Sequence, residues 1–513
     1  MIELSTKRLE LRDVVAVARQ DAEVVLSDEA RRAMAESATI VQRLADSDEP
    51  VYGVSTGFGS LATTPIPAKR RTELQRALLR SHAGGMGPPV EREVVRAMML
   101  LRARTLAMGY SGTRPEVAEA ILVMLNAGLT PVVPEHGSLG ASGDLAPLAH
   151  CGLALIGEGE VFARRSERLA TAEALAARGM EPLTLTAKEG LALINGTDGM
   201  LGILALAIND LERLLRVADV SAAMSVEALL GTDRAFADDL IALRPQPGQG
   251  ASAANMHRLL EDSPIVASHR ENDPRVQDAY SLRCAPQVNG AARDTLAHSR
   301  RVAEAELASA IDNPMILPDG RVESCGNFHG APVALACDFL AIASAEVGAI
   351  AERRIAMLID AGVSRLPPFL CAEPGLNSGF MIAHVTAASL ASENKSLAHP
   401  ASVDSLPTSA NQEDHVSMAT FAARRLQPMI HNTANILGIE LLAAAQGIEF
   451  LRPLTSSAAL EAVHALLRTR CAAMMSDRYL APEIERATAL VTDGSLARIL
   501  RTLPALPKLW IPA

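Results

Sequence analysis

Apolar residues recur every three or four positions over several long stretches of this chain. The longest of these stretches cover residues 187–230, 276–311, 331–359 and 413–451. This spacing places the apolar side chains on one face of a helix. Helix breaks are expected where the pattern is interrupted, at Gly196, Gly199, Gly202 and Pro286. Helices of this length bury their apolar faces by packing lengthwise, so the sequence predicts a central bundle of long helices.

Shorter helical patterns alternate with glycine-rich loops in the first 200 residues. Ser27 is followed by two acidic residues, which is typical of a helix N-terminus, and the pattern runs to about Asp46. Further helices are predicted over residues 91–108, 115–125 and 144–156, and residues 158–186 read as a polar surface excursion. We therefore expect an N-terminal helix-and-loop domain over residues 1–200. A long-helix bundle domain over residues 201–513 ends in shorter helices such as 457–468.

The composition supports an all-α fold. Hydrophobic residues make up 49% of the 513 residues, but aromatic residues make up only 3%, and Ala and Leu are abundant. These residues favour helices, whereas a large β protein contains more aromatic and β-branched side chains.

The net charge of −11 argues against nucleic acid as a partner.

Cysteine usage and hydropathy indicate a cytoplasmic protein. None of the six cysteines forms a Cys-x-x-Cys pair, which is typical of free thiols in a reducing compartment and gives no zinc-site spacing. The first residues contain no apolar signal region. No uninterrupted apolar stretch reaches the roughly 18 residues that span a membrane, so we expect no membrane partner.

The segment with the most unusual chemistry is Gly-Ser-Leu-Gly-Ala-Ser-Gly-Asp-Leu-Ala-Pro-Leu, residues 137–148. The small residues Ala141, Ser142 and Gly143 allow the backbone to bend until the Gly143 nitrogen attacks the Ala141 carbonyl carbon. Loss of water from this ring and from Ser142 leaves a C=C group conjugated to an imidazolone, which is a strong electrophile. Ala-Ser-Gly alone is common in ordinary loops, but the longer string is far more specific. The spacing does not match the Gly-x-Ser-x-Gly motif of serine hydrolases.

This segment resembles the prosthetic-group motif of the aromatic amino acid ammonia-lyases that act on histidine, phenylalanine or tyrosine. Their electrophile is 4-methylidene-imidazole-5-one (MIO), so the resemblance implies MIO formed from Ala141-Ser142-Gly143 and no external cofactor or metal. It extends over nearly the whole chain. It also implies a homotetramer in which each active site is shared between chains.

Two further motifs of this family lie in the N-terminal half of the chain. Tyr52 begins Tyr-Gly-Val-Ser-Thr-Gly-Phe-Gly, in which Ser55 replaces the usual Asn, and the matching Tyr lies over the electrophile. The pair Ser81-His82 resembles the histidine-specific branch, where it lines the pocket for the substrate side chain. Without the resemblance, the first motif is a glycine-rich turn and a lone His is more often structural.

Asn-Gly-Thr-Asp, residues 195–198, resembles the family's Asn-Gly-Thr-Gln, with Asp198 as a departure. Asn195 is implied to hold the prosthetic group near the substrate. The string at residues 276–287 contains Gln277, Tyr280 and Arg283. Arg283 suits an α-carboxylate because its guanidinium pairs with it in a bidentate way. Tyr280 is the expected base for the β-proton, and a phenol does this only where nearby positive charge or a helix N-terminus lowers its pKa. Gln277 is expected to orient the ring.

Three more residues complete the implied site. Phe328, in Gly-Asn-Phe-His-Gly, forms a wall against the electrophile, and Met381 is a pocket residue; both are otherwise ordinary core residues. Glu413 resembles the acidic residue that histidine-specific members place at the substrate imidazole, where phenylalanine-specific members have Gln. A carboxylate and an imidazole form a charge-assisted hydrogen bond.

The resemblance therefore implies elimination of ammonia from L-histidine to give trans-urocanate, the first step of histidine degradation. Either the substrate amine or its imidazole attacks the electrophile, and either Tyr280 or Glu413 is the base. The alternatives are a tyrosine or phenylalanine ammonia-lyase, an aminomutase, a non-catalytic helical scaffold, or a fumarase-like helical lyase without the modified ring. His82 and Glu413 favour histidine among these substrates.

Overall fold

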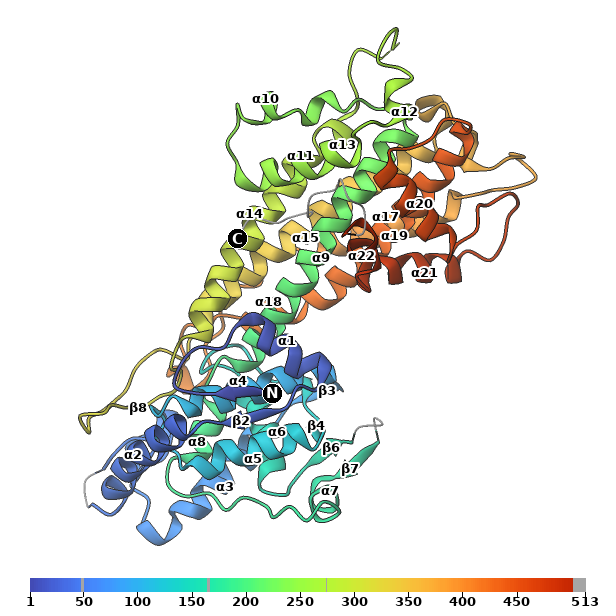
Figure 1. The fold of residues 1–513 in the computed structure, drawn as a ribbon. Coiled ribbons are helices and arrows are strands. Elements are labelled where there is room, and N and C mark those ends of the chain that lie inside the picture. The colour runs from blue at the N-terminus through green and yellow to red at the C-terminus, as the bar shows by residue number, and fades with distance from the viewer. Residues whose placement is uncertain (48–49, 164–166, 274, 502–513) are drawn as a thin grey trace. The chain divides into compact units, whose positions relative to one another are not determined.

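The computed structural model describes residues 1–47, 50–163, 167–273 and 275–501, which form two compact units (Figure 1). The first unit comprises residues 1–206, 300–338 and 400–424, and the second comprises residues 207–299, 339–399 and 425–513. The fold is mostly helical, as the sequence predicted, with nine short strands among the described residues. A domain boundary at residue 200 stays a prediction.

The first unit packs short helices around α4 (Arg92–Ala107), whose residues are almost all buried. Helix α4 contacts α1, α2 and α5, while α3 contacts α6 and α8. The helices that lie wholly in this unit are α1 (Leu11–Gln20), α2 (Asp28–Ala45), α3 (Arg71–His82), α4, α5 (Pro115–Asn126), α6 (Leu145–Leu155), α7 (Thr171–Ala176), α8 (Glu189–Ile194) and α18 (Ala419–Arg424).

Short strands connect these helices without forming a large sheet. Strands β1 (Ile2–Leu4) and β2 (Val24–Leu26) are parallel. The other pairings are antiparallel: β3 (Met86–Pro89) with β5 (Pro134–His136), β6 (Glu160–Phe162) with both β4 (Thr130–Pro131) and β7 (Arg168–Ala170), and β8 (Met315–Ile316) with β9 (Val322–Glu323). Short one-turn 3-10 helices are η1 (Gly59–Leu61), η2 (Ala68–Arg70), η3 (Arg234–Phe236), η4 (Pro368–Leu370) and η5 (Ser409–Asn411).

Three long helices have residues in both units: α9 (Asp198–Ala228), α14 (Ala285–Leu307) and α15 (Ala331–Ile359). The second unit also contains α10 (Asp238–Ile241), α11 (Pro247–Leu259), α12 (Pro264–Ala267), α13 (Tyr280–Arg283), α16 (Ala361–Ser364), α17 (Met381–Leu397), α19 (Leu426–Leu451), α20 (Ala458–Arg468), α21 (Ala481–Thr492) and α22 (Ser495–Arg501). The predicted long helices are confirmed, and α15 has the predicted bounds. The predicted break at Gly196 separates α8 from α9, whereas Gly199 and Gly202 lie inside α9.

Buried charges connect the long helices of the second unit. Glu440 on α19 is fully buried and accepts hydrogen bonds from Ser221 (2.8 Å) and Ser225 (2.7 Å) on α9 and from Arg354 Nη2 on α15 (3.0 Å). A buried carboxylate is tolerated only when it is paired and hydrogen-bonded. These contacts fix how α9, α15 and α19 pack.

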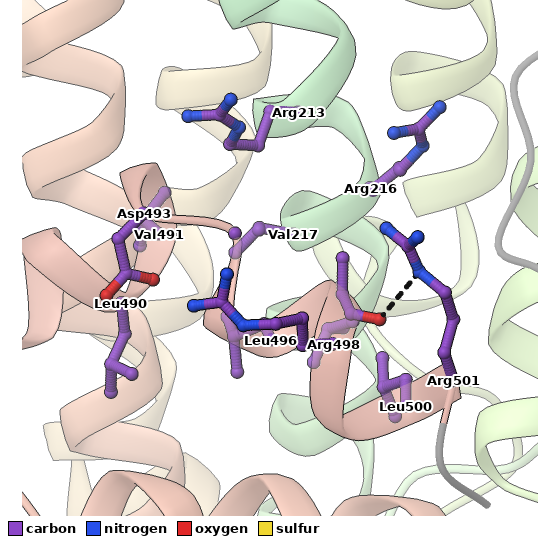
Figure 2. A pocket seen from close by; sticks show the side chains of 13 residues that line it. Arg213, Arg216, Val217, Leu490, Val491, Asp493, Leu496, Arg498, Leu500 and Arg501 are labelled. Carbon is purple, nitrogen blue, oxygen red and sulfur yellow. Dashed lines mark hydrogen bonds between the residues drawn. The ribbon is translucent and has the colours of Figure 1, made fainter.

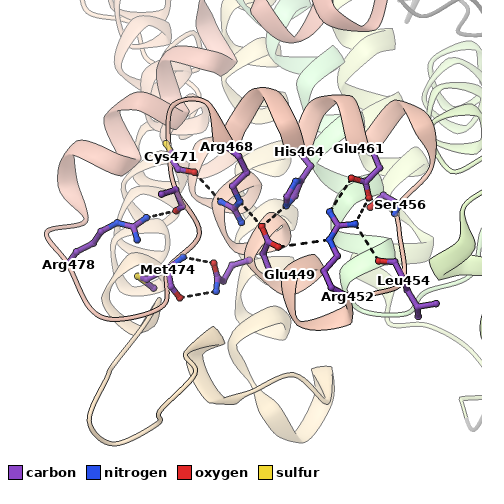
Figure 3. Close-up of polar contacts among 12 residues, drawn as sticks. Glu449, Arg452, Leu454, Ser456, Glu461, His464, Arg468, Cys471, Met474 and Arg478 are labelled. Atoms are coloured by element: carbon purple, nitrogen blue, oxygen red, sulfur yellow. Dashed lines mark hydrogen bonds and ion pairs between the residues drawn. The ribbon is translucent and has the colours of Figure 1, made fainter.

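Ion pairs also hold the turn between α19 and α20 (Figure 3). Glu449 accepts a hydrogen bond from Arg468 Nε at 2.9 Å and lies 3.1 Å from His464 Nε2. Arg452 Nη1 donates to Glu461 Oε1 at 2.6 Å. This network joins the end of α19 to one face of α20 and is structural in character.

The prediction of one helix over residues 413–451 was wrong at its start. Helices begin only at Ala419, and α18 and α19 are separate elements. Glu413 instead pairs with Thr408 through backbone hydrogen bonds, and Met418, at φ +55°, donates its N–H to Leu139 O at 2.8 Å. These tertiary contacts override the helical pattern of the sequence.

Two helices, Ala331–Ile359 and Ala419–Leu451, are long and apolar enough to cross a membrane by length and composition alone. They are not apparent as spans in the sequence, because polar residues such as Asp338 interrupt their apolar runs. The structure buries 61% and 78% of their most apolar windows inside the protein. They are therefore core helices of a soluble protein.

Candidate active site

A cavity of about 540 Å³ in the first unit brings together five of the residues that the sequence singled out. This volume lies in the range of small-molecule sites. The five residues come from loops and helix ends that are far apart in the chain: Tyr52, His82, Ser142, Asn195 and Glu413.

The loop that carries Ala141, Ser142 and Gly143 is pressed against a neighbouring backbone. Gly143 has φ +76°, and a Cβ atom added there would lie 2.1 Å from the carbonyl oxygen of Gly196. Gly140 has φ +66°, and its Cβ would lie 2.2 Å from Ser417 Oγ. Only glycine fits such positions without strain. The packing thus forces a tight turn at the two residues that flank Ala141 and Ser142.

Asp144 fixes the end of this loop from a fully buried position. Its N–H donates to Gly196 O at 2.7 Å, and its carboxylate accepts from Met200 N–H (2.9 Å) and Thr420 Oγ1 (2.7 Å). Burial raises the pKa of Asp144, while the hydrogen bonds from Thr420 and Met200 oppose this shift. Asp144 directly precedes α6, as the sequence predicts, but its carboxylate makes no capping bond to α6 and caps the first turn of α9.

A buried ion pair fixes the side chain of Asn195. Its Nδ2 donates to Asp312 Oδ1 (3.2 Å) and to Asn313 O (2.9 Å), and Lys188 Nζ lies 2.6 Å from Asp312 Oδ2. Burial lowers the pKa of Lys188, while Asp312 opposes this shift. Within the described residues, Asn195 Oδ1 is buried without a hydrogen-bond partner. The amide oxygen is therefore available to a donor on a ligand.

Arg102 supports the same turn from inside the protein. It donates to Asn195 O (2.8 Å) and Ile311 O (2.9 Å), and Nη1 lies 3.4 Å from Asp198 Oδ2. Asp198, which stands where the family usually has Gln, thus provides a negative charge beside the buried guanidinium of Arg102. No motif in the sequence points to Arg102, Lys188 or Asp312. The only signal was the presence of arginines within the apolar helix predicted over residues 91–108.

Removing one partner of the buried pair should be costly. We expect Asp312→Asn to lower the free energy of unfolding by about 3–5 kcal/mol, because it leaves the Lys188 ammonium buried without a counter-charge. Denaturant unfolding measures this change. The matched control is Asp319→Asn, because Asp319 forms an exposed pair with Arg321 and its loss should leave the midpoint nearly unchanged. Equal effects of the two substitutions would contradict the assignment.

Glu413 contacts Ser142 directly. Its Oε1 accepts from Ser142 Oγ at 2.8 Å, and its Oε2 accepts from Thr408 Oγ1 at 2.6 Å. The turn just before it contains three successive left-handed residues, at φ values of +50°, +53° and +66°, in η5. Such backbone is strained for residues other than glycine and is often found at functional sites. The strained turn presents the carboxylate to Ser142.

His82 is the last residue of α3 and presents one ring nitrogen for recognition. Its Nδ1 lies 3.0 Å from both Leu78 O and Ser81 Oγ. A proton on Nδ1 is required for the bond to the carbonyl, and this tautomer leaves Nε2 as an acceptor. Tyr52 lies across the same cavity, where its hydroxyl accepts from Gly59 N–H at 3.3 Å.

Seven predicted site residues are not among those that line this cavity within the chain, and two of them, Ala141 and Gly143, flank Ser142 in its loop. Phe328 is half-buried in the first unit. The other four belong to the second unit: Gln277, Tyr280, Arg283 and Met381. Tyr280 is 72% exposed, and the Arg283 guanidinium lies 4.7 Å from the centre of its ring. The structure thus pairs these two side chains with each other.

No group of three or more His, Cys, Asp or Glu side chains in the described part of the chain is placed to hold a metal ion.

Comparison with known proteins connects this chain to one family. The model of the aromatic amino acid lyase family matches residues 9–469. Histidine ammonia-lyase of Streptomyces avermitilis is 56% identical over 493 residues, which cover 96% of each chain. Histidine ammonia-lyase of Symbiobacterium thermophilum is 53% identical over 95% of this chain and 96% of its own.

Solved structures of the same fold include more than one activity. The crystal structure of histidine ammonia-lyase from Trypanosoma cruzi matches with a TM-score of 0.91 and 39% identity, over 100% of this chain and 98% of that one. Tyrosine aminomutase from Streptomyces globisporus matches with a TM-score of 0.93 and 36% identity, over 99% of each chain. Fold alone therefore does not select the reaction.

Proposed function

Since the chain belongs to the aromatic amino acid lyase family, we propose that its Ser142 cavity removes ammonia from L-histidine and releases trans-urocanate. The activity is that of a histidine ammonia-lyase, because relatives of that name share about half of their residues with this chain over nearly its full length. The site observation that supports this substrate is that His82 and Glu413 line one cavity with Ser142.

We infer that Ala141, Ser142 and Gly143 form the MIO group of the family. The chain fits this group, because Gly143 is held in a turn that no other residue enters without a clash at Gly196. Its nitrogen is the attacking atom, the Ala141 carbonyl carbon is attacked, and two waters leave. Once formed, the group supplies an electrophile that makes ammonia loss feasible. Asp144 ties the end of this loop to Gly196 through its N–H, and Arg102 holds that neighbouring turn through the carbonyl oxygen of Asn195.

Glu413 gains a free oxygen when Ser142 loses its hydroxyl group. The donor that now occupies Oε1 is the Ser142 hydroxyl, so dehydration leaves this oxygen open to a substrate N–H. His82 Nε2 is a second acceptor in the same cavity. An imidazolium carries two N–H donors, which matches two acceptors, whereas a phenyl or phenol ring does not. The cavity therefore suits a histidine side chain.

The remaining motif residues are proposed to come from other copies of the chain. Tyr280 and Gln277 lie at the surface of the second unit, where Tyr280 is 72% exposed. Large apolar side chains are also exposed along single helices, at Leu335, Phe339 and Ile342 on α15 and at Ile382 and Val385 on α17. Exposed apolar stripes of this kind usually mark subunit interfaces. A homotetramer with shared active sites accounts for both observations.

In such a shared site, Arg283 would bind the substrate carboxylate and Tyr280 would remove the β-proton. Gln277, Phe328 and Met381 would orient and enclose the ring system. Glu413 remains the alternative base, because its carboxylate lies beside Ser142. We place the enzyme in the cytoplasm, since all six cysteines are free thiols in the structure.

The direct test is to incubate the purified protein with L-histidine and to record the ultraviolet absorbance of urocanate. The same assay with L-tyrosine and L-phenylalanine, followed by product analysis, separates the related ammonia-lyases and aminomutases. Ammonia release with urocanate formation from L-histidine alone is the expected result. A scaffold protein would release nothing from any of the three.

Substrate preference should depend on His82 and Glu413 together. We expect the double variant His82→Leu/Glu413→Gln to lose about 10²-fold or more in kcat/KM for L-histidine, because each lost polar contact is worth roughly 1–3 kcal/mol. Discrimination against L-phenylalanine should fall as well, since a phenyl ring no longer leaves two buried acceptors unpaired. The matched control is Asp414→Asn, at an exposed neighbour that does not line the cavity. An unchanged ratio of kcat/KM values would remove both residues from the selectivity assignment.

A further inference from the structure

A second large cavity, of about 920 Å³, lies wholly in the second unit and is lined by four arginines (Figure 2). Arg213 and Arg216 stand on α9, and Arg498 and Arg501 stand on α22, across the cavity from them. The members of each pair are three residues apart, so they lie on the same face of their helix. Two helices thus direct four guanidinium groups to one hollow.

Few carboxylates compensate this charge. Asp493 is the only acidic residue among the described residues that line the cavity, and it lies 2.8 Å from Arg470 Nη1 and accepts from Ser495 N–H at 2.7 Å. Glu212 lies 3.4 Å from Arg216 Nη2. The concentration of positive charge is unexpected in a chain whose net charge is −11.

The other three arginines donate to neutral oxygens. Arg213 donates to the carbonyl oxygen of Thr492, Arg498 to Ser495 Oγ (3.1 Å), and Arg501 to Ala497 O (3.2 Å). These bonds orient the side chains but do not neutralise them. Each guanidinium has five N–H donors, so several remain for a ligand.

Arg216 illustrates how unfavourable this arrangement of like charges is. Its Nε atom is buried and has no hydrogen-bond partner among the described residues. Burial lowers its pKa most, and the nearby charges of Arg293, Arg501 and Arg213 lower it further, although Glu212 opposes the shift. A cluster of like charges without enough counter-charge is stabilised by a bound anion.

Most of the remaining cavity wall is aliphatic. It is formed by Val217, Val220, Leu490, Val491, Leu496 and Leu500. An inorganic ion would use only the cationic side of this hollow. A ligand with both anionic groups and an apolar portion would use both sides.

We propose that this cavity is a binding site for an organic phosphate, whose phosphate groups pair with Arg213, Arg216, Arg498 and Arg501 and whose apolar portion lies on the aliphatic wall. Arginine is suited to this role because its planar guanidinium binds phosphate oxygens in a bidentate way. The site is separate from the Ser142 cavity in its residues, and the proposal does not depend on the reaction there.

The test is calorimetric titration of the full-length protein with adenosine triphosphate, inorganic tripolyphosphate and adenosine, at matched and near-physiological ionic strength. We expect saturable binding of the two phosphates, tighter binding of the nucleotide, and no binding of adenosine. Arg213→Gln and Arg498→Gln should each weaken nucleotide binding about tenfold or more. Arg498→Lys, which keeps the charge but not the bidentate geometry, should lie between Arg498→Gln and the parent.

The matched control is Arg244→Gln, which removes the same charge from an exposed position of the second unit outside the cavity. It should bind the nucleotide like the parent. Circular dichroism and urocanate formation establish that each variant is folded. The proposal is overturned if neither phosphate binds saturably at this ionic strength, or if Arg244→Gln weakens binding as much as the cavity variants.

Discussion

Ser142→Ala is expected to give a folded protein that forms almost no urocanate from L-histidine. Alanine has no hydroxyl group to lose, so the electrophile cannot form even if Gly143 still attacks Ala141. Removal of a covalent catalyst typically costs a factor on the order of 10³ or more in kcat. The fold should persist, because the only hydrogen bond that this side chain makes within the described residues is the one to Glu413. The assay is kcat on L-histidine, with the absorbance and intact mass of the protein recorded beside it.

Two further variants make this prediction specific. Ser142→Cys should retain part of the activity, since loss of hydrogen sulfide gives the same alkene. Ser47→Ala is the matched control, because Ser47 bonds Leu44 O at the end of α2 and does not line the cavity. If purified Ser142→Ala turned over L-histidine at the parent rate, the electrophile would have to be sought elsewhere. A parent mass that is not lower by two waters would equally contradict ring formation.

The sequence identified residues that the structure brings together in one cavity, but not the residues that hold them in place. Ser142 and Glu413 are separated by 271 positions, yet both were recognised from local motifs, and the structure places them 2.8 Å apart. A motif can be recognised without knowing which residues surround it in the fold, because its chemistry requires a fixed order of residue types along the chain. The sequence contains no comparable local pattern for the residues that hold this pair in place.

Arg102 illustrates that limit. It stands in an apolar helix and contacts the backbone oxygens of Asn195 and Ile311, which are 93 and 209 positions away. Every residue has a backbone carbonyl group, so the type of the accepting residue does not reveal that a distant side chain donates a hydrogen bond to it. The same holds for Lys188 and Asp312, which are 124 positions apart. Such contacts become visible only when the fold is known.

Helix bounds were predicted well where local signals agree with packing. Ser27 caps α2 by accepting from Ala30 N–H at 3.1 Å, as its position before two acidic residues indicated. The failure at residues 413–418 has the opposite origin. That segment has a helical pattern, but its backbone bonds go to Thr408 and Leu139. Tertiary contacts prevail over weak local propensity.

The position of Tyr280 could not be predicted from its motif, and it leads to the second large expected effect. Tyr280→Phe should keep the fold and much of the affinity for L-histidine but lower kcat by about 10²–10⁴-fold, the usual loss when a general base is removed. The change deletes only the phenol oxygen, and the exposed ring stays beside Arg283. Steady-state kinetics should therefore show a loss in kcat with little change in KM. A raised KM with unchanged kcat would make Tyr280 a binding residue and leave Glu413 as the base.

Tyr280→Phe also tests whether active sites are shared between chains. Tyr280 belongs to the second unit, and the Ser142 cavity is lined by the first. If each site combines Ser142 of one chain with Tyr280 of another, co-expression of Ser142→Ala with Tyr280→Phe should restore activity at about a quarter of the sites, because random assembly pairs the two intact residues that often. Mixing the same variants after separate purification is the control, since assembled oligomers do not exchange chains quickly. If co-expression restored no activity while both variants were folded and oligomeric, each site would have to draw both residues from a single chain.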